Sequence, residues 1–269
     1  MDIEKAQTWH YDRHAEQYVG VDQGLNRILS RVVLPRAASV LDVGCGIGNL
    51  TLRLREKGSP QRVVGIDVSG GVLSIARRHA RELGLSNFEF VRASAMDLPF
   101  ADGGFDVVVS NMVFHLIPDQ GRALCEIVRV LRPLGSTVLH FLGGGDFAPE
   151  ITQIFNRAWN EVLPQTQAPR LTHDLTVKQA AEILAAAGMT EFGIAWHRSS
   201  HCITEADVPE FLRFWHLVSG YWRHGLSEGV ADRIQDIFDG QVRARAKSSG
   251  QFEYALDLLL LRFTRPETL

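Results

Sequence analysis

Three glycines at alternate positions, with an acidic residue just before them, form the stretch of this sequence best suited to holding a nucleotide-like ligand. Gly44, Gly46 and Gly48 follow the apolar run 39–43, which contains Asp42. Such a run predicts a buried parallel strand, and the leucine-rich segment after the turn predicts a helix. Glycine allows unusual backbone angles and lets a ligand approach the backbone closely. The strand, turn and helix together therefore predict a cradle for a nucleoside.

The spacing of these glycines separates the motif from the dinucleotide-binding fingerprint. A dinucleotide fold reads G-x-G-x-x-G and opens its helix onto a pyrophosphate, whereas here the glycines stand at i, i+2 and i+4. A carboxylate beside the turn repels a pyrophosphate but attracts a cation. Asp42 therefore favours a ligand that carries an ammonium group.

A second acidic residue ends the next predicted strand. Residues 62–67 read R-V-V-G-I-D, and Asp67 lies about twenty residues beyond the glycine turn, where a carboxylate can accept both hydroxyls of a ribose. Nicotinamide enzymes and S-adenosylmethionine enzymes share this geometry. Asp67 thus indicates a nucleoside without choosing between the two cofactors.

The string V-L-D-V-G-C-G-I-G-N at 40–49 resembles the first motif of the class I S-adenosylmethionine-dependent methyltransferases. The resemblance spans residues 38–142 and includes F-D-V-V-V-S-N at 105–111 and E-I-V-R-V-L-R-P at 126–133. These strings look like the small-molecule branch that includes ubiquinone-pathway methyltransferases. The resemblance implies S-adenosyl-L-methionine as cofactor, with its methionine part against the glycine loop and its amino group held by Asp42.

The resemblance also implies a set of cofactor-binding residues. They are Asp42, Gly44, Cys45, Gly46, Gly48, Asp67, Val68, Ser94, Ala95, Met96, Asn111 and Tyr18. The family usually has an acid at the position of Ser94, where it accepts from the adenine amino group. A serine accepts without the charge that strengthens the bond, so backbone groups at Ala95 and Met96 are expected to contribute more.

Methyl transfer from a sulfonium needs little catalytic machinery. The methyl is already activated, so the enzyme mainly holds the acceptor lone pair about 3 Å from it, opposite the sulfur. Alcohols and phenols need a general base, whereas a carboxylate or an amine near neutral pH does not. His115, just after the fourth predicted strand, is the one histidine nominated at the active edge, either as that base or as a wall of the pocket.

Two closer resemblances concern the acceptor. The segment 119–123, the string F-L-G at 141–143 and the large last insertion look like juvenile hormone acid methyltransferase, and the layout is similar to malonyl carrier-protein methyltransferase. Both families esterify carboxylates, and Gln23 falls where they place a glutamine, which holds the carboxylate in the hormone enzyme. They usually have tryptophan at the position of Leu116, unlike this chain.

The resemblances therefore predict an S-adenosylmethionine-dependent methyltransferase of a small, partly apolar molecule, with carboxylate O-methylation favoured. Gln23 and His115 are the predicted catalytic residues. The alternatives are phenol or alcohol O-methylation, N-methylation and C-methylation. A non-catalytic S-adenosylmethionine-binding protein is the alternative from another class. A nicotinamide oxidoreductase would need the G-x-G-x-x-G spacing and a Tyr-x-x-x-Lys pair, and the sequence has neither.

The elements that position these residues follow from the apolar periodicity. Strands are predicted at 39–43, 62–67, 88–92, 105–110, 136–142, 189–197 and 252–263. Helical patterns lie between them. This order predicts an α/β, Rossmann-like, seven-stranded, mostly parallel sheet with helices on both faces and a helical lid or cap.

The domain organisation follows from the same pattern. Residues 1–34 are expected to form an N-terminal helical cap, and the resemblance implies that its Tyr11, Tyr18 and Gln23 close over the cofactor and substrate. Residues 35–269 form the methyltransferase domain, with helical insertions at about 146–175 and 200–250 as a substrate lid. The roughly fifty residues between the last two strands exceed a normal connection. An aromatic stripe runs along one helix of this insertion: Phe211, Phe214, Trp215, Val218 and Trp222.

The composition of the chain restricts the classes of partner that the protein is expected to bind. A net charge of −3 and a pI near 6.4 argue against a nucleic-acid partner. The longest apolar run, 258–261, is too short to span a bilayer, and residues 1–20 lack a signal-peptide core. Three cysteines without paired spacing indicate a reducing cytoplasm. The sequence predicts a cytoplasmic monomer or homodimer with a small-molecule acceptor, no membrane partner and no metal.

Overall fold

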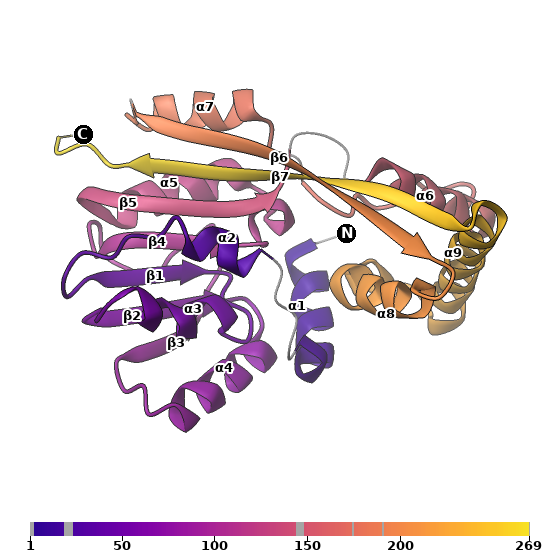
Figure 1. Ribbon diagram of the computed structural model, residues 1–269, viewed down its shortest axis with the longest axis horizontal. Helices are drawn as coiled ribbons and strands as arrows, with labels where there is room; N and C mark the ends of the chain where they lie inside the picture. Colours follow the sequence, from indigo (N-terminus) through magenta and orange to yellow (C-terminus); the bar gives the residue numbers. More distant parts are fainter. Residues whose placement is uncertain (1–2, 19–23, 144–147, 174, 190, 269) are drawn as a thin grey trace.

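A seven-stranded sheet organises the computed structural model, which describes residues 3–18, 24–143, 148–173, 175–189 and 191–268. The strand order is β3-β2-β1-β4-β5-β7-β6 (Figure 1). The strands are β1 Ser39–Val43, β2 Arg62–Asp67, β3 Phe88–Arg92, β4 Phe105–Asn111, β5 Leu131–Leu142, β6 Phe192–Thr204 and β7 Gln251–Thr264. The first five pair in parallel, and β7 is antiparallel to both β5 and β6. The predicted mostly parallel sheet is therefore confirmed.

Helices cover both faces of this sheet. The α-helices are α1 Ile3–His14, α2 Leu25–Leu29, α3 Asn49–Arg53, α4 Gly70–Glu82, α5 Gln120–Val130, α6 Pro149–Val162, α7 Val177–Ala186, α8 Val208–Ser219 and α9 Glu228–Ser249. Short 3-10 turns are η1 Ala15–Tyr18, η2 Leu54–Lys57, η3 Phe114–Leu116 and η4 Gly220–Arg223. Apolar residues of α5 and α7 pack on one face, and those of α2, α3 and α4 pack on the other. The apolar periodicity of the sequence arises from these two buried layers.

The parallel strands bring the predicted cofactor residues to one edge. β1 is buried throughout and lies between β2 and β4. Its neighbours end in Asp67 and Asn111, and the glycine turn begins directly after Val43. Strand order reverses between β1 and β4, and ligands of open α/β sheets bind outside the carboxyl ends at such a point. The topology therefore gathers these residues at one place.

The last two strands extend beyond the sheet as a long antiparallel ribbon. They pair continuously from Phe192 opposite Phe263 to Thr204 opposite Gln251. The sequence prediction for β6, 189–197, was wrong at both ends. It stopped at His197 because Arg198, Ser199 and Ser200 break the apolar alternation, and in the structure this part of the ribbon lies largely exposed.

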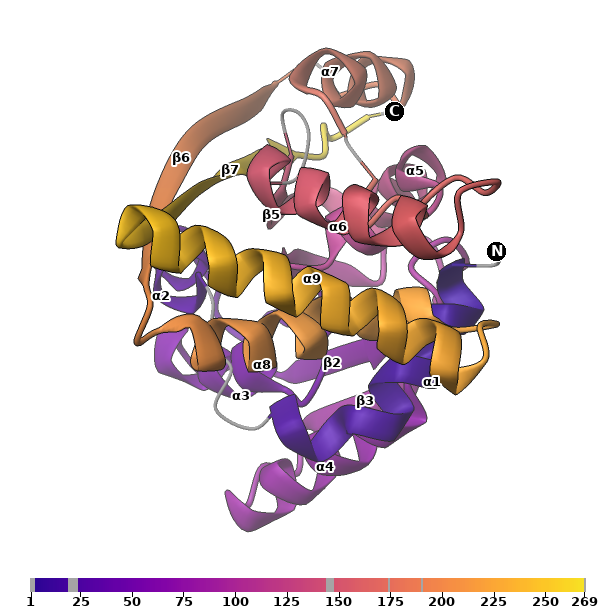
Figure 2. The same cartoon turned by 90° about the vertical axis from the view of Figure 1, so that its right-hand side faces the viewer.

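The ribbon carries a helical cap, which we define as α6, α8, η4 and α9. The cap has its own apolar core, rich in aromatic side chains, to which β7 also contributes. Figure 2 shows α6 and α8 on either side of α9, with α1 alongside, and α1 contacts η4 directly. The N-terminal helix thus lies between the sheet edge and the cap.

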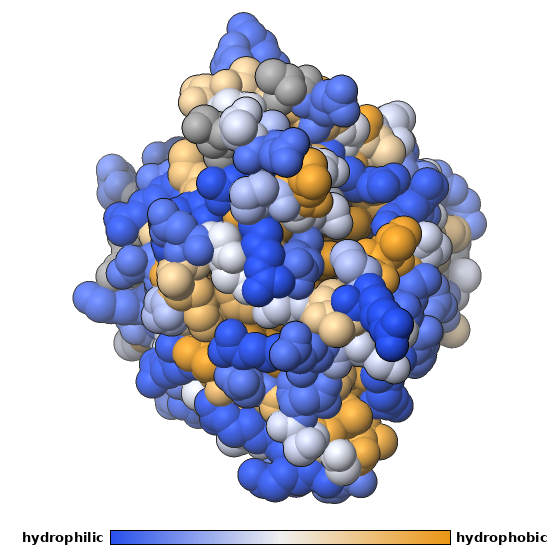
Figure 3. All heavy atoms as spheres, turned by 90° about the vertical axis from the view of Figure 1, so that its left-hand side faces the viewer, coloured by the Kyte–Doolittle hydropathy of each residue, from blue (hydrophilic) through white to orange (hydrophobic). Residues whose placement is uncertain are grey.

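The opposite end of the molecule, at the left of Figure 1, presents mainly hydrophilic side chains with dispersed apolar ones (Figure 3). No helix within the described ranges combines the length and the apolar character that a membrane span requires.

Candidate functional site

A cavity of about 280 Å³ lies at the carboxyl ends of β1, β2 and β4 and continues to the cap. The glycine turn, the strand ends and the 93–96 loop line one part of it. Side chains of α1, α6, α8 and β7 line the other part. A single cavity therefore joins the predicted cofactor residues to the predicted acceptor wall.

The glycine turn leaves one side of its loop open. Gly44, Gly46 and Gly48 all have positive φ, at 71°, 54° and 88°. A Cβ on Gly44 would lie 2.4 Å from Cγ1 of Val113, so Gly44 is required by protein packing. A Cβ on Gly46 would meet no protein atom within 4 Å, although Gly46 lines the cavity. The space above Gly46 is thus where a ligand can approach the backbone.

Asp67 is held rigidly at the end of β2. Its Oδ2 accepts a hydrogen bond of 3.0 Å from the backbone N–H of Gly46, and its Oδ1 accepts one of 3.0 Å from Ser69 N–H. Burial raises the pKa of Asp67, and these backbone hydrogen bonds act in the opposite direction. Each carboxylate oxygen has a further lone pair, so Asp67 can accept two ribose hydroxyls.

Asp42 is a buried carboxyl group, only 1% exposed. Thr51 Oγ1 donates to its Oδ2 over 2.6 Å. Burial raises the pKa of Asp42 to about 7, and the neighbouring Asp67 adds to the effect. Among the described residues no lysine or arginine forms an ion pair with it. A buried carboxyl without a cation suits an incoming ammonium group.

Ser94 folds the loop that follows β3. Its Oγ accepts from Met96 N–H at 3.2 Å, and its carbonyl accepts from Asp97 N–H at 3.2 Å. Ser94, Ala95 and Met96 all line the cavity. The serine hydroxyl therefore supports the turn, and the role of Ala95 and Met96 in adenine recognition stays a prediction.

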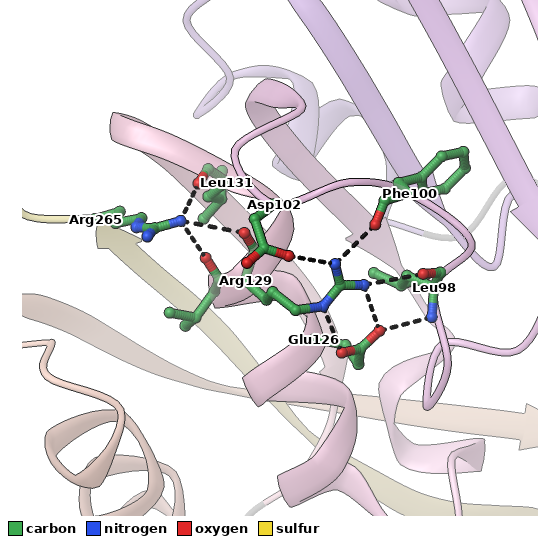
Figure 4. A network of polar contacts seen from close by, with 8 residues as sticks. Leu98, Phe100, Asp102, Glu126, Arg129, Leu131 and Arg265 are labelled. Carbon is green, nitrogen blue, oxygen red and sulfur yellow. Dashed lines mark hydrogen bonds and ion pairs between the residues drawn. The ribbon is translucent and has the colours of Figure 1, made fainter. Parts of the chain in front are cut away.

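A polar network fixes the continuation of this loop to α5 (Figure 4). Arg129 donates to the carbonyls of Leu98 and Phe100 at 2.9 and 2.7 Å, and pairs with Glu126 and Asp102 at 2.7 and 2.8 Å. Glu126 in turn accepts from Leu98 N–H at 2.7 Å. The loop therefore depends on the E-I-V-R segment of α5 for its position.

His115 lies in η3, just after β4, and lines the cavity at 6% exposure. Its Nδ1 accepts a 3.4 Å hydrogen bond from Leu142 N–H. Burial lowers the pKa of His115 to about 3, and the nearby His140 and His173 add to this. The ring is therefore neutral and a weak proton acceptor.

Asn111 lies at the end of β4, opposite His140 on β5. Oδ1 of Asn111 and Nδ1 of His140 are 2.9 Å apart. Because an amide oxygen only accepts, Nδ1 carries the proton. Burial lowers the pKa of His140 to about 4, so this ring is also neutral. Asn111 is thus oriented at the cavity edge by the neighbouring strand.

The side of the cavity that faces the cap is mainly apolar and aromatic. Phe211, Phe214, Trp215 and Val218 come from α8. Their lining neighbours from other elements are Tyr11, Leu142, Ile151, Leu171, Thr172, Tyr254 and Leu256. No lysine or arginine occurs among the described residues that line the cavity as a whole. The acidic residues among them are Glu4, Asp42 and Asp67.

The N-terminal helix α1 closes one side of this cavity through hydrogen bonds to η3, to the start of α4 and to α8 of the cap. Gln7 Nε2 donates to the carbonyl of Leu116 at 2.8 Å, and His10 Nε2 donates to that of Leu217 at 2.6 Å. Asp12 Oδ1 accepts from Ser69 Oγ at 2.7 Å and from Gly71 N–H at 2.8 Å. α1 therefore touches the cofactor side and the cap together.

The structure brings most of the predicted site residues together. The cavity lining includes Asp42, Gly44, Cys45, Gly46, Asp67, Val68, Ser94, Ala95, Met96, Asn111 and His115. Gly48 is not part of it: Gly48 is the N-cap of α3, and a Cβ there would lie 3.3 Å from Ala76 Cβ. Tyr18 belongs to η1, but its side chain and the whole of Gln23 lie outside the described residues.

Several lining residues were not predicted. Gln7 on α1, Leu171 and Thr172 in a connection, and Tyr254 and Leu256 on β7 are the main ones. The two β7 residues lie within the predicted strand 252–263, but the pattern of that strand does not say which element its side chains will face. Leu171 and Thr172 carry no signal in the sequence, because only the path of the connection brings them to the cavity.

Comparison with known proteins finds a family model that matches the central part of the chain. Residues 41–139 match the family model described as a methyltransferase domain. The chain is 37% identical over 127 residues to a demethylmenaquinone methyltransferase from Lactococcus lactis, which covers 47% of this chain and 50% of the relative. The corresponding protein from Thermus thermophilus is 42% identical over 100 residues, 37% of this chain and 45% of the relative. The chain spans about half the length of these curated relatives.

Solved structures share the fold at lower identity. The YcgJ protein from Bacillus subtilis has a TM-score of 0.62 at 18% identity, covering 91% of this chain and 98% of that chain. A Haemonchus contortus phosphoethanolamine N-methyltransferase 2, in complex with phosphomonomethylethanolamine and S-adenosylhomocysteine, also has a TM-score of 0.62, at 16% identity, over 99% of this chain and 60% of that one. These similarities establish the fold.

Proposed function

We propose that this chain, of which residues 41–139 match a methyltransferase domain, is a class I S-adenosylmethionine-dependent methyltransferase that transfers a methyl group to a small, largely apolar molecule. The observation that carries this proposal is the single cavity, which joins the glycine turn and Asp67 to the aromatic wall of the cap. A protein that only stores or senses the cofactor has no need of such a second compartment.

The residues of the cofactor compartment fit S-adenosylmethionine. Asp42 offers a buried carboxyl to the amino group, Asp67 offers two acceptors to the ribose, and the space above Gly46 admits the ligand. When bound, the cofactor supplies a methyl group activated by a cationic sulfur. The protein has to hold both reactants in line and exclude water.

The acceptor compartment favours a molecule with a large apolar part. Its lining is dominated by aliphatic and aromatic side chains, and the described lining has no cation to pair with a strongly charged group. A polar part of the acceptor is instead expected to be held by neutral hydrogen-bond donors. The family match ends at residue 139, before the cap, so the relatives' named substrate is not transferred to this chain.

We favour carboxylate O-methylation over phenol or alcohol O-methylation, because a carboxylate needs no general base. His115 has a pKa of about 3, whereas a phenol loses its proton near pH 10. His115 is therefore a poor base for a phenol. Phenol, alcohol, amine and carbon acceptors are the alternatives. Carbon methylation is one of these alternatives because the chain is similar to demethylmenaquinone methyltransferases.

The cap also fits the role of a lid formed by the predicted insertions 146–175 and 200–250. The segment made of α8, η4 and α9 follows β6 and precedes β7, so both of its ends are attached to paired strands of the sheet. Limited proteolysis should cut the 200–250 segment more slowly with S-adenosylhomocysteine and acceptor bound than without them. Identical cleavage would indicate a static wall.

The activity is tested by incubating the protein with methyl-labelled S-adenosylmethionine and a cell extract, then identifying the labelled product by mass spectrometry. The label should enter an organic-solvent-soluble molecule, and calorimetry should show binding of S-adenosylhomocysteine but not of NADH. Phe214→Asp should stop transfer while S-adenosylhomocysteine still binds, and Phe214→Leu is the matched control. Binding of NADH instead would overturn the proposal.

A further inference from the structure

The orientation of the His115 ring is fixed by a backbone donor. Leu142 N–H can only donate, so Nδ1 of His115 must accept. A neutral imidazole that accepts at Nδ1 carries its proton on Nε2. The hydrogen-bond geometry alone therefore assigns the Nε2–H tautomer to this ring.

The other ring nitrogen opens on the cavity. No described residue bonds to Nε2 of His115, yet this atom is not sealed, unlike Nε2 of His140 and of His173, which are buried without a partner. His115 is buried except where it lines the cavity. Its Nε2–H is thus a donor that the folded protein leaves to the cavity.

The segment around His115 is clamped from two sides. The carbonyl of His115 accepts from His173 N–H at 2.7 Å. Gln120 Nε2 donates to the carbonyls of Phe114 and His173, at 2.8 and 3.0 Å. These bonds hold η3 against the connection that carries Leu171 and Thr172. The donor is therefore preorganised, which lowers the entropy cost of binding a ligand.

We propose that Nε2–H of His115 is a fixed hydrogen-bond donor that binds an oxygen atom of the methyl acceptor, rather than a base that deprotonates it. This proposal rests on the proposed function and specifies its substrate class: the acceptor carries a carboxylate or carbonyl oxygen next to the atom that is methylated. His115 exchanges no proton. The acceptor lone pair forms the new bond to the methyl carbon, and the carbon–sulfur pair stays on sulfur.

The surroundings of the ring keep it neutral over the useful pH range. The titratable groups near it are His140 on β5 and His173, and both have a lowered pKa because of burial. The acidic residues of the described lining, Glu4, Asp42 and Asp67, belong to the same cavity. Leu142 contributes only its backbone N–H. The donor should therefore be present throughout pH 5.5 to 8.5.

The tautomer is measured directly by nitrogen NMR on protein with 15N-labelled histidine, in complex with S-adenosylhomocysteine. The spectrum of His115→Gln assigns the His115 signals by their loss. We expect a protonated Nε2 and an unprotonated Nδ1 from pH 5.5 to 8.5. A protonated Nδ1, or a ring that titrates between pH 6 and 7, would overturn the proposal. This readout needs no acceptor and does not depend on turnover.

The role of the donor is tested with two variants in the labelled-extract assay. The side-chain amide of Gln can place an N–H near the position of Nε2, so His115→Gln should keep activity within about tenfold of the wild type. His115→Leu fills similar space without a donor and should lose about 5- to 150-fold. Equal losses, or no loss in His115→Leu, would contradict the donor role. If the wild type labels no product although it binds S-adenosylhomocysteine, the proposed function fails while the NMR result stands.

Discussion

The backbone N–H of Gly46 donates a 3.0 Å hydrogen bond to Oδ2 of Asp67. This bond joins the glycine turn after β1 to the acidic end of β2, two motifs that are 21 residues apart in the chain. The Asp67 carboxylate and the open backbone above Gly46 therefore keep a fixed relative position. A ligand that uses both meets a preformed site.

Asp67→Asn should weaken S-adenosylhomocysteine binding about tenfold or more. The amide keeps one acceptor for a backbone N–H but loses the charge, and a charge-assisted hydrogen bond contributes roughly 1.5–3 kcal/mol. Isothermal titration calorimetry gives the dissociation constant. Asp236→Asn, on the exposed side of α9, changes the net charge equally and should have no effect. An unchanged dissociation constant for Asp67→Asn would show that the ribose binds elsewhere.

Cofactor affinity should rise as the pH increases from 6 to 8. The pKa of Asp42 is raised from 3.8 to about 7 by burial, so below pH 7 its carboxyl is largely protonated. A bound ammonium favours the ionised form, so binding near pH 7 releases a proton. Calorimetry in two buffers of different ionisation enthalpy measures this release.

Asp42→Asn is the control for that pH dependence, since it keeps the shape and removes the titrating group. It should abolish the proton release and lower affinity for S-adenosylhomocysteine. Affinity is also expected to decline above about pH 8, where an α-amino group loses its own charge. Equal proton release by Asp42→Asn and the wild type would show that another group titrates.

Gly46→Ala should reduce cofactor affinity, whereas Gly84→Ala should not. Both glycines have positive φ, at 54° and 67°, and a Cβ on either meets no protein atom within 4 Å. The backbone strain is therefore similar, about 1–2 kcal/mol. Only the methyl on residue 46 projects into the cofactor compartment. Similar losses of thermal stability with different dissociation constants would support this, and equal affinities would place the cofactor elsewhere.

Arg129→Met should weaken S-adenosylhomocysteine binding several-fold and lower the melting temperature by a few degrees. Arg129 holds the carbonyls of Leu98 and Phe100, so its loss frees the loop that follows Ser94. The side chain is partly exposed, which reduces the contribution of its ion pairs. Arg198→Met removes a comparable bidentate pair with Asp257 on the ribbon and should leave binding unchanged.

Leu134→Gly should stabilise the protein. Leu134 has a φ of 63° and is 66% exposed, so it has the cost of a left-handed backbone without the benefit of burial. Relieving about 1 kcal/mol corresponds to a rise of roughly 2–4 °C in melting temperature for a chain of this size. Leu83→Gly is the control, because Leu83 is also exposed but has a φ of −89°. A lower melting temperature for Leu134→Gly would contradict the strain.

The acceptor wall shows where prediction from sequence stopped. The stripe on α8 was visible because helical spacing places Phe211, Trp215 and Val218 on one face. Thr172 and Tyr254 join the same wall from distant parts of the chain. Spacing within one element carries no information about which other element it will face.

The sequence by itself determined the mostly parallel sheet, apart from the ends of β6, together with the glycine turn and the two acidic residues beside it. These features follow from short-range rules: buried strands need continuous apolar runs, tight turns need glycine, and parallel strands bring their carboxyl ends to one edge. Only the tertiary structure decided the state of His115. Its position after β4 allowed either a base or a wall, and it is Leu142 N–H on β5, together with burial, that fixes its tautomer and lowers its pKa. Desolvation and hydrogen bonding between distant residues depend on packing, which no local pattern encodes.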